Sequence, residues 1–581
     1  MHSFIHKDRG RFFVRGAFIR FYIPALLSSF WLAVAGVADS VFVGNGVGSA
    51  GLAAISLGQP VYLFYNILSY GFSIGGSIHY ASRMAEGRAQ EANRIFITIL
   101  RLLLTTYIVT ACLGLLLQPQ LMRVLGADPA DPVTFTYIRT QLIFVPIMFC
   151  QGPFYFFVNA DNGPKTAAAA MSVSGITDAI FSYIFVMRMG LGVAGSVYST
   201  VVGALLMLMI TGWHIVSKKG ALHFRWESHD WNIVRRSART GFSTSVHYLF
   251  QFITMIAVNR ILIKMGGAVA VAAFDVVYNI SLLCQSIADG AIVATEPMIS
   301  SYRSERNIEN IRLTMQYSLR WSTFLSLAMA VIFAVFSPQF SVFFGMKEGV
   351  ELIYASEGIR IFALSVLPAM LNMLFGGYYQ TLLKERLAYL ITFLRSFVFY
   401  LMALYMSSKI GMSVFWYIFT IVEVLTILVW IPLTARKGGI LQLKDIDVTN
   451  VKTVVVDSAD QNITKIIEDM QAFAEERGAG PREAMYIGLT VEEICCAIIE
   501  RFRDHMEGIY VQVTVVVEDN DTTLYLRDNA YEFNPLGEDT NSISLEEGRA
   551  LDLVGLQIVQ KKAKEFYYRR YSGFNTLVIR L

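Results

Sequence analysis

Long apolar runs separated by short polar connections fill the chain up to about residue 440. A membrane-spanning helix needs about 20 mostly apolar residues, and twelve runs meet this requirement. Because the number of spans is even, both ends of this region are expected on one side of the membrane. The predicted spans are approximately 17–42, 51–77, 95–117, 138–160, 166–188, 192–215, 240–265, 271–297, 315–337, 360–383, 388–408 and 413–434.

The pattern changes after "KGGILQLKDID". Short runs rich in β-branched residues, "VKTVVVD", "YVQVTVVVED", "TTLYLRD" and "NTLVIRL", predict strands. Three amphipathic segments, "ADQNITKIIEDMQAFAEERG", "PREAMYIGLTVEEICCAIIERFRDH" and "EEGRALDLVGLQIVQKKAKEF", predict helices. We therefore expect an all-α membrane protein of twelve spans in two six-helix bundles, 1–222 and 223–440, followed by an α/β sandwich domain, 441–581.

Charge separates the same two parts of the chain. Residues 1–443 carry 33 Lys and Arg against 20 Asp and Glu, whereas residues 444–581 carry 15 against 25. The net charges are +13 and −10, so the near-neutral whole is a basic membrane body joined to an acidic soluble domain. Most basic residues of the body lie in alternate connections, such as "SRMAEGRAQEANR" and "SYRSERNIENIR". The positive-inside rule therefore predicts cytoplasmic termini and a cytoplasmic tail domain.

The membrane region also contains an internal repeat. The block "ADSVFVGNGVGSAGLAAISL", around Asp39, resembles "VNRILIKMGGAVAVAAFDV", around Asn259. In each copy an arginine, Arg83 or Arg303, follows 44 residues after the matched position. Parallel repeats of this kind usually enclose a substrate site between their halves and alternate its access by rocking. The pattern therefore favours a transporter over a purely structural bundle.

Acidic residues inside the apolar spans of the first half are candidates for function. A carboxylate in hydrocarbon costs several kcal/mol unless it is neutral, paired or facing water. Asp39 lies near the outer end of the first span, and Asp178 lies in the middle of the fifth, one turn before Ser182. The structural alternatives are a snorkelling role for Asp39 and a helix–helix hydrogen bond for Asp178.

The second half carries a different set of ionisable residues. His247 and Asp289 fall deep within the seventh and eighth spans and are candidates for a second-half cavity. Asp275 and Glu296 are expected near the membrane surfaces, where water would solvate them. Arg395, in the eleventh span, is expected to pack or to meet a lipid headgroup.

Three blocks, "IPALLSSF…VADSVFVGNGVGSAGLAAISLGQP", "GLGVAGSVYSTV" and "VEVLTILVWIPL", resemble the multidrug and toxic compound extrusion (MATE) family, in its branch of bacterial drug exporters. The likeness covers residues 17–434. It implies a cation-coupled antiporter that exchanges inward H⁺ or Na⁺ for outward substrate.

The resemblance also implies a cation site in the first half. Asp39 matches the family's first-helix carboxylate, and Thr200, in "YSTV", matches a hydroxyl that lines the site. The fifth helix of the family commonly has Asn and, four residues later, Asp; this sequence has Asp178 and Ser182 instead. Both acids are kept at a changed spacing, so either H⁺ or Na⁺ fits the set. Glu423 matches a position that is often acidic in the family.

The tail resembles the histidine-kinase-like ATPase fold, in its branch of anti-sigma-factor serine kinases. The likeness covers about residues 452–581 and depends on the order of "GLTVEEICCAIIERF", "RDNAYEFNPL" and "LVGLQIVQKKAKEF". It implies that Asp528 takes the adenine amino group of a nucleotide such as ATP or ADP. Glu493, Phe533 and Gly555 match further positions of the nucleotide pocket.

The tail departs from that family where phosphate and Mg²⁺ would bind. Ala497 stands at the position of the Mg²⁺-holding Asn, and Ala530 replaces a glycine of the turn. Leu553 and Val554 replace glycines that would let the backbone approach phosphate at a helix N-terminus. We therefore expect no kinase or ATPase activity from the tail, and no metal site or catalytic set elsewhere in the chain.

Together these features predict an exporter of amphipathic, cationic organic compounds in a bacterial plasma membrane, with a cytoplasmic regulatory domain. Transport itself is expected to need no cofactor and no nucleic acid. The acidic tail would dock on the basic loops at 216–239 and 303–320 or bind a cytoplasmic protein. Two alternatives stay open: a membrane-tethered anti-sigma-type serine kinase or signalling sensor, and a flippase for lipid-linked precursors.

Overall fold

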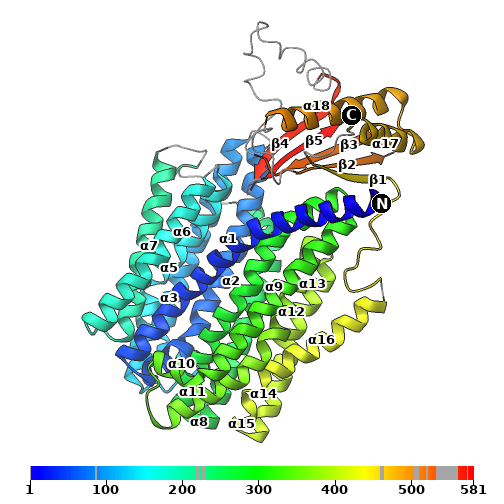
Figure 1. Ribbon diagram of the computed structural model, residues 1–581. Helices are drawn as coiled ribbons and strands as arrows, with labels where there is room; N and C mark the ends of the chain where they lie inside the picture. The colour runs from blue at the N-terminus through cyan, green and yellow to red at the C-terminus, as the bar shows by residue number, and fades with distance from the viewer. Residues whose placement is uncertain are drawn as a thin grey trace.

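The structure is a computed structural model of the chain. It describes residues 2–85, 88–161, 163–217, 222–224, 230–436, 438–457, 463–501, 510–518, 521–530, 561–571 and 574–581. A bundle of long helices forms the body, and a small α/β domain lies against one end of it (Figure 1). This end of the body is called the tail side below, and the opposite end the far side.

Helices account for nearly all of the described body. In the first half they are α1 (His2–Gly46), α2 (Ser49–Ala85), α3 (Ala89–Leu116), α4 (Gln118–Leu125), α5 (Pro132–Ala160), α6 (Pro164–Ser182), the π-helical segment η1 (Tyr183–Arg188) and α7 (Val193–Val216). In the second half they are α8 (Trp231–Ser304), α9 (Ile308–Val335), α10 (Ser337–Phe343), α11 (Gly349–Phe362), η2 (Ala363–Ser365), α12 (Val366–Thr381), α13 (Glu385–Phe393), the π-helical η3 (Leu394–Val398), α14 (Phe399–Ile410), α15 (Met412–Phe415) and α16 (Ile418–Arg436).

Eleven helical stretches within the described residues are long and apolar enough to cross a membrane. One of them, Ser245–Ser304, has 60 residues and would be about 90 Å long as one helix, three times the hydrocarbon thickness. Gly267 breaks this stretch with a left-handed backbone, φ 65° and ψ −158°. The seventh and eighth predicted spans therefore lie within α8, on either side of Gly267, which reconciles the eleven stretches with twelve spans.

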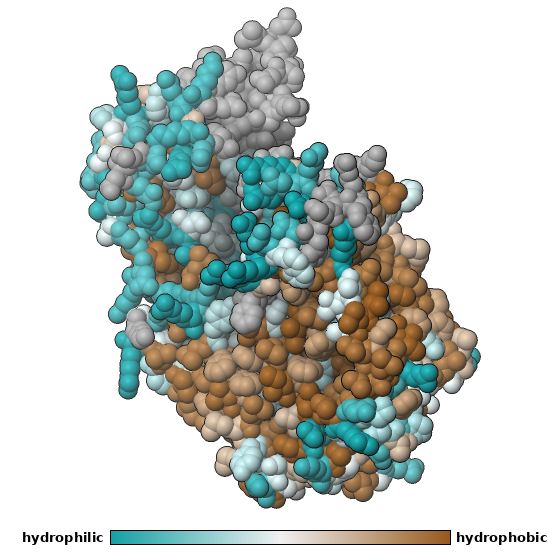
Figure 2. Space-filling view, turned by 180° about the vertical axis from the view of Figure 1, so that it is seen from behind, coloured by the Kyte–Doolittle hydropathy of each residue, from teal (hydrophilic) through white to brown (hydrophobic). Residues whose placement is uncertain are grey.

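The surface of the body agrees with a membrane setting. On the face shown in Figure 2, hydrophobic residues cover the broad middle of the body, and hydrophilic residues gather toward its two ends and over the tail. Burial of apolar helix faces against each other and against lipid is what holds such a bundle in place.

The first helix connects the two halves. Near the far side, Val37 and Val43 of α1 pack into the cluster that contains the first-half helices. Near the tail side, Phe13 and Phe18 pack instead with residues of α8, α9 and α12. The Tyr22 hydroxyl also lies 3.1 Å from the Ser322 Oγ of α9. Relative motion of the halves must therefore act on the contact between α1 and α8.

The tail contains one five-stranded antiparallel sheet with the order β1-β2-β3-β5-β4. Its elements are β1 (Val451–Asp457), α17 (Ile463–Glu476), α18 (Pro481–Arg501), β2 (Tyr510–Glu518), β3 (Asp521–Asp528), β4 (Glu565–Tyr571) and β5 (Phe574–Arg580). Four of the strands and these two helices confirm the predicted elements.

The fifth strand corrects one prediction. The sequence suggested a helix continuing to Phe566, but β4 begins at Glu565 and pairs with β5. Only the last part of that predicted helix falls within the described residues. A strand forms here because the antiparallel partner β5 supplies backbone hydrogen bonds to this edge, which local periodicity cannot reveal.

Alternation along the strands gives the sheet two different faces. Val511, Val513 and Leu526 point to one face and pack with α17 and α18. Gln512, Thr514 and their neighbours point to the other face, which is not covered by α17 or α18 and lies toward the membrane body (Figure 1). We call this the open face of the sheet.

Candidate functional site

The two acidic residues predicted in the first half lie together. Asp39 of α1 accepts a hydrogen bond from the Ser196 Oγ at 3.4 Å, and Asp178 of α6 accepts one from the Thr200 Oγ1 at 3.4 Å. Both hydroxyl groups come from α7, so one helix supports both acids. The two carboxyl groups are also close enough to interact electrostatically, with Ser182 beside Asp39.

Some oxygen atoms of this cluster have unused hydrogen-bonding capacity. Asp178 Oδ1 and Ser182 Oγ are buried and have no hydrogen-bond partner among the described residues. Buried polar atoms are normally paired, so such atoms indicate room for a ligand or water. The cluster of two carboxylates and several hydroxyls can hold a proton or a small hard cation.

A change of helix type occurs at the same place. Ser182 is the last residue of α6, and the chain continues as the π-helical η1. Short π-helical segments within α-helices are frequent at functional sites, because they turn side chains away from the regular helical face. Asp178 and Ser182 are four residues apart within α6, so regular α-helical spacing places both on the face toward the cluster, and η1 begins directly after them.

Asp275 differs from its prediction. It was expected near the membrane surface, but its side chain is only 2% exposed. Its Oδ2 accepts a hydrogen bond of 3.0 Å from the Asn279 Nδ2, which also lies 3.0 Å from the Ser40 Oγ of α1. Ser40 directly follows Asp39, so this network joins α8 to the first-half cluster. The prediction failed because the helix packs against α1 at that depth and excludes the expected water.

The repeat partner of Asp39 also joins the halves. The Asn259 Nδ2 donates to the Ser56 carbonyl oxygen at 2.8 Å, and its Oδ1 accepts from the Ser56 Oγ at 3.2 Å. Asn259 is fully buried, and all its amide groups are used in this pair. The position that is an acid in the first half is therefore a fixed interhelical contact in the second.

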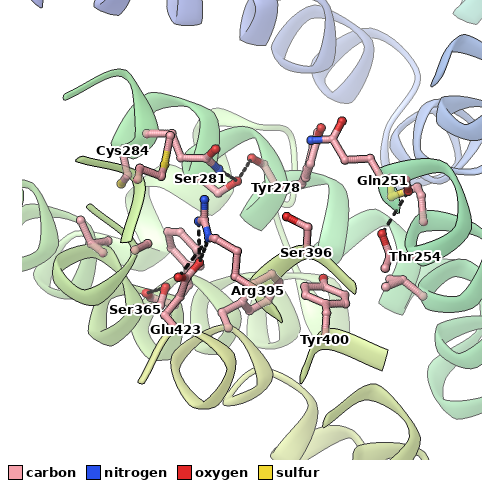
Figure 3. A pocket seen from close by; sticks show the side chains of 18 of the residues that line it. Gln251, Thr254, Tyr278, Ser281, Cys284, Ser365, Arg395, Ser396, Tyr400 and Glu423 are labelled. Carbon is pink, nitrogen blue, oxygen red and sulfur yellow. Dashed lines mark hydrogen bonds and ion pairs between the residues drawn. The ribbon is translucent and has the colours of Figure 1, made fainter. Parts of the chain in front are cut away.

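A cavity of about 350 Å³ lies in the second half. His247 and Asp289, the two predicted cavity residues, both line it. Polar and aromatic side chains from α8, η3, α14 and α16 surround it (Figure 3). The residues labelled in that view are Gln251, Thr254, Tyr278, Ser281, Cys284, Ser365, Arg395, Ser396, Tyr400 and Glu423.

An ion pair crosses the wall of this cavity. The Arg395 Nη2 donates to the Glu423 Oε1 at 2.6 Å (Figure 3). The Asn372 Nδ2 donates to the Glu423 Oε2 at 2.6 Å. The Trp430 Nε1 in turn donates to the Asn372 Oδ1 at 2.7 Å. Arg395 was expected to pack or to meet a lipid headgroup, and its partner is instead the carboxylate of Glu423. No pattern in the sequence indicates this pairing, because the residues are 28 positions apart on different helices.

The ion pair and the acidic cluster occupy corresponding places in the two halves. Arg395 lies in the π-helical η3 of the eleventh span and pairs with the twelfth. Asp178 lies just before the π-helical η1 of the fifth span and bonds to the sixth. Both halves thus have a π-helical segment at this position. In the first half it lies beside two acids, and in the second half it lies beside an ion pair.

The halves contact each other on both sides of the membrane. On the tail side, the His79 Nε2 lies 2.9 Å from the Thr240 Oγ1. At the next residue of α8, a Cβ on Gly241 would lie 1.7 Å from the Gly71 carbonyl oxygen of α2. On the far side, the Asn45 Nδ2 donates to the Phe343 carbonyl oxygen at 2.8 Å. Either side must release its contacts before the interior is accessible from that side.

The tail pocket predicted from the sequence is described in part. Asp528 ends β3, and its Oδ1 accepts hydrogen bonds from the Asn575 Nδ2 at 2.8 Å and the Ala530 N at 3.0 Å. Glu493 lies on α18 and is half-buried. Phe533 and Gly555 lie outside the described residues.

The tail also contacts the body directly. The Arg527 guanidinium pairs with Glu305 at the end of α8, and its Nη2 donates to the Ser301 Oγ at 2.5 Å. Arg306 pairs with Glu518, and the Asn307 Nδ2 lies 3.3 Å from the Thr453 Oγ1. These contacts lie at or beside the predicted 303–320 loop. Docking on the 216–239 loop stays a prediction, because residues 218–221 and 225–229 lie outside the described residues.

One polar cluster escaped the sequence analysis. The Tyr80 hydroxyl donates to the Asp161 Oδ1 at 2.5 Å, the Leu222 N donates to the Asp161 Oδ2 at 3.2 Å, and the His214 Nε2 lies 3.6 Å from the same oxygen. It joins α2, α5 and α7 at the tail side. No motif marks it, because its members come from four separate segments.

Two six-span halves with ionisable groups buried in each define the class of the protein, a polytopic membrane transporter. The family model described as MatE matches residues 24–184 and 243–406, more than half of the chain. The chain therefore belongs to the MatE family of multidrug and toxic compound extrusion transporters. The two matched segments fall in the two halves, in agreement with the internal repeat.

Curated relatives are similar over most of their length. "Probable multidrug resistance protein YoeA" of Bacillus subtilis is 20% identical over 354 residues, which cover 59% of this chain and 76% of that protein. "Multidrug resistance protein MdtK" of Yersinia enterocolitica is 21% identical over 427 residues, which cover 69% of this chain and 90% of that protein.

Solved structures show the same fold. A MATE family transporter in an inward-facing conformation aligns with a TM-score of 0.64 at 21% identity, covering 72% of this chain and 98% of that one. A MOP superfamily transporter from Pyrococcus furiosus aligns with a TM-score of 0.56 at 22% identity, covering 74% and 97%.

Proposed function

We propose that this protein is a cation-coupled antiporter that exports amphipathic, mainly cationic organic compounds across the plasma membrane of a bacterium. Family membership and relatives named as multidrug resistance proteins support the export of organic compounds. The distribution of basic connections supports a cytoplasmic location for both termini and for the tail. The tail side is then the cytoplasmic side.

The main observation that supports cation coupling is the acidic cluster of the first half. Asp39 and Asp178 lie within electrostatic range of each other, and Asp178 Oδ1 has no hydrogen-bond partner among the described residues. Two carboxyl groups in one apolar interior share or exchange protons, because their negative charges repel. A proton bound here removes one charge and changes which packing of the first half is favoured.

The cation and the substrate would use different halves. The second-half cavity offers Asp289 beside aromatic walls that include Tyr278 and Tyr400. Because Glu423 neutralises Arg395, Asp289 provides an attractive charge for an organic cation. The Asp275–Asn279–Ser40 network lies between the cluster and the second half, so it is placed to transmit a change from one to the other.

Proteoliposomes test the coupling directly. Ethidium transport is driven separately by a pH gradient and by a Na⁺ gradient in the wild type, Asp39→Asn and Asp178→Asn. Each substitution is expected to reduce gradient-driven transport at least about tenfold, which corresponds to about 1.4 kcal/mol in the coupled step. The matched control is Asp128→Asn, which alters an exposed aspartate in the connection after α4.

The outcomes separate the alternatives. Transport driven by the pH gradient supports proton coupling, and transport driven only by the Na⁺ gradient assigns the same oxygen cluster to Na⁺. Wild-type activity in both cluster variants contradicts the site. Asp289→Asn is expected to weaken transport of ethidium while sparing an uncharged substrate, which tests the cavity independently.

For the tail we propose a regulatory role, with an adenine nucleotide as the ligand of the Asp528 pocket. The resemblance to the ATPase fold and the burial of Asp528 under α18 support this proposal. Isothermal titration of the full-length protein with ATP and ADP, with and without Mg²⁺, tests it. We expect binding that is independent of Mg²⁺ and lost in Asp528→Ala, with no phosphate release. Hydrolysis, or unchanged binding in the variant, would contradict it.

A further inference from the structure

The open face of the tail sheet is covered by the membrane body. Gln512 and Thr514 of β2 point to this face, and they are 2% and 0% exposed although neither α17 nor α18, the two described helices of the tail, packs there. The body supplies the cover: Tyr510 packs against the tail-side cluster of α1, α8 and α9, and Tyr525 lies against the end of α8. A five-stranded sheet with polar residues on a covered face has a specific docking partner, and here the partner is part of the same chain.

Arg527 is the centre of this interface. Its guanidinium pairs with Glu305, donates to the Ser301 Oγ and lies over the Tyr302 ring, 4.9 Å from the centroid. Arg527 and Glu305 are 8% and 2% exposed, so the two charges depend on each other for compensation. The carboxylate and the hydroxyl bind the edge of the guanidinium, and the aromatic ring packs against its face, so both its position and its orientation are defined. We call these four residues the latch.

The latch binds the end of α8, the helix that also carries residues of the candidate sites. Glu305 follows directly after α8, whose last 38 residues, Gly267–Ser304, also carry Asp275, Asn279 and Asp289. At the same time β1 contacts the start of α1, which lies beneath the tail (Figure 1). The tail therefore touches α1 and α8 at once. Farther along, these two helices pack so closely that a Cβ on Gly290 would lie 2.7 Å from the Leu26 Cα.

We propose that the docked tail is a brake: through the Arg527–Glu305 latch it holds the cytoplasmic ends of α1 and α8 together and restrains opening of the transporter toward the cytoplasm. This inference rests on the proposed function for its direction, because an exporter loads its substrate from the cytoplasm. Opening separates α1 and α2 from α8. A domain fixed to both sides of that contact adds its docking free energy to the closed arrangement and slows loading.

The first test measures opening without any transport. Thr240 lies in the cytoplasmic contact between the halves, against His79, so the thiol introduced by Thr240→Cys reports when this contact opens. The background carries Cys112→Ser and Cys496→Ser, because the other three native cysteines are buried. Maleimide labelling of that thiol is compared in the unmodified latch, Arg527→Glu, Glu305→Arg, and the double variant with both charges exchanged.

The brake predicts a defined pattern of labelling. Each single reversal places two like charges together and should raise the labelling rate about fivefold or more, the lower end of typical coupling effects. The exchanged pair should return the rate toward that of the unmodified latch. Equal or slower labelling in both single variants, with monodisperse protein, would overturn the proposal.

The second test closes the brake, and so does not depend on the folding of the latch variants. Asn307→Cys with Thr453→Cys places two thiols across the interface, where the native side chains lie 3.3 Å apart. A short reversible dithiol cross-linker should reduce ethidium export severalfold, and reduction should restore it. The matched control pair, Asp521→Cys with Lys564→Cys, cross-links within the tail and should leave export unchanged.

Failure of the brake and failure of the proposed function give different results. If no variant transports ethidium under any gradient, the proposed function fails, while the labelling pattern still decides the brake. If ethidium export is intact and the interface cross-link leaves it unchanged, the brake fails alone.

Discussion

Arg395 donates hydrogen bonds to both carboxylate oxygens of Glu423, from Nε at 3.1 and 3.2 Å and from Nη2 at 2.6 Å, across the wall of the second-half cavity. In the corresponding helix pair of the first half, Asp178 accepts from Thr200. The repeat has therefore kept the contact between these spans while placing acid in one half and a neutralised pair in the other. On this asymmetry we base the proposal that the cation binds in the first half and the organic substrate in the second.

Removal of the Arg395 guanidinium should lower the stability of the protein, because Glu423 would then be left as a buried charge without its partner. In Arg395→Gln the carboxylate of Glu423 keeps only its bond from Asn372, and loss of one partner of a buried pair costs about 3–5 kcal/mol. We expect a clear fall in the melting temperature of the detergent-solubilised protein. The double variant with Glu423→Gln removes both charges and should recover most of the loss. A double variant as unstable as the single one would show that the pair is not the cause.

Closure of the tail side should be sensitive to a single methyl group. In Gly241→Ala the new Cβ would lie 1.7 Å from the Gly71 carbonyl oxygen, so the halves must separate to admit it. Overpacking of this kind costs about 1–3 kcal/mol, which would depopulate the closed arrangement about fivefold or more. Faster labelling of the Thr240→Cys thiol and slower ethidium export are the expected results. Gly212→Ala on α7, where a Cβ meets nothing within 4 Å, is the matched control.

The Asp275 network should couple two helices energetically. In Asn279→Ala the buried Asp275 carboxylate and Ser40 hydroxyl lose their shared partner, which costs about 1–3 kcal/mol. A double-mutant cycle with Ser40→Ala on thermal stability should give a coupling energy of about 0.5 kcal/mol or more. Strict additivity of the two changes would contradict the network. Transport in Asn279→Ala should fall more than its stability explains, since the network lies between the two candidate sites.

The tail should lose stability in acid through one surface cluster. A hydrogen bond from Lys564, with a further contribution from Arg580, holds the pKa of Asp521 below its ordinary value of 3.8. A depressed pKa in the folded state stabilises the fold above pH 3.8, and this contribution disappears as the pH falls through the lower folded value. Limited proteolysis of the tail between pH 5 and pH 3 measures it.

The matched variant for that experiment is Asp521→Asn. It should lack the part of the increase in proteolysis between pH 5 and pH 3 that comes from protonation of Asp521. The effect should be small and reduced by salt, because the group is exposed and screened. A pH dependence that is the same in the variant and the wild type would assign the loss to other groups.

Hydropathy and repetition determined the architecture. Apolar runs long enough to span a bilayer must become helices there, because lipid offers no partners for backbone groups. The same reasoning marked Asp39 and Asp178 as residues that need a reason to be buried, and the structure places them in one cluster. Period-two runs similarly predicted four of the five tail strands. The fifth, β4, was missed because its pairing with β5, and not a pattern in its own residues, makes this segment a strand.

Pairings between distant residues were decided only by tertiary structure. Depth along a helix can be counted from the sequence, but the neighbour at that depth cannot, so Asp275 was expected in water and lies instead beneath Asn279 and Ser40. Net charge predicted that acidic residues of the tail would contact basic residues of the body. The pair of Arg306 in the body and Glu518 in the tail agrees with this prediction. In the other pair the signs are reversed, because the tail supplies Arg527 and the body supplies Glu305. A domain's net charge is a sum over its whole surface, whereas docking is decided by the few charges that the interface removes from water.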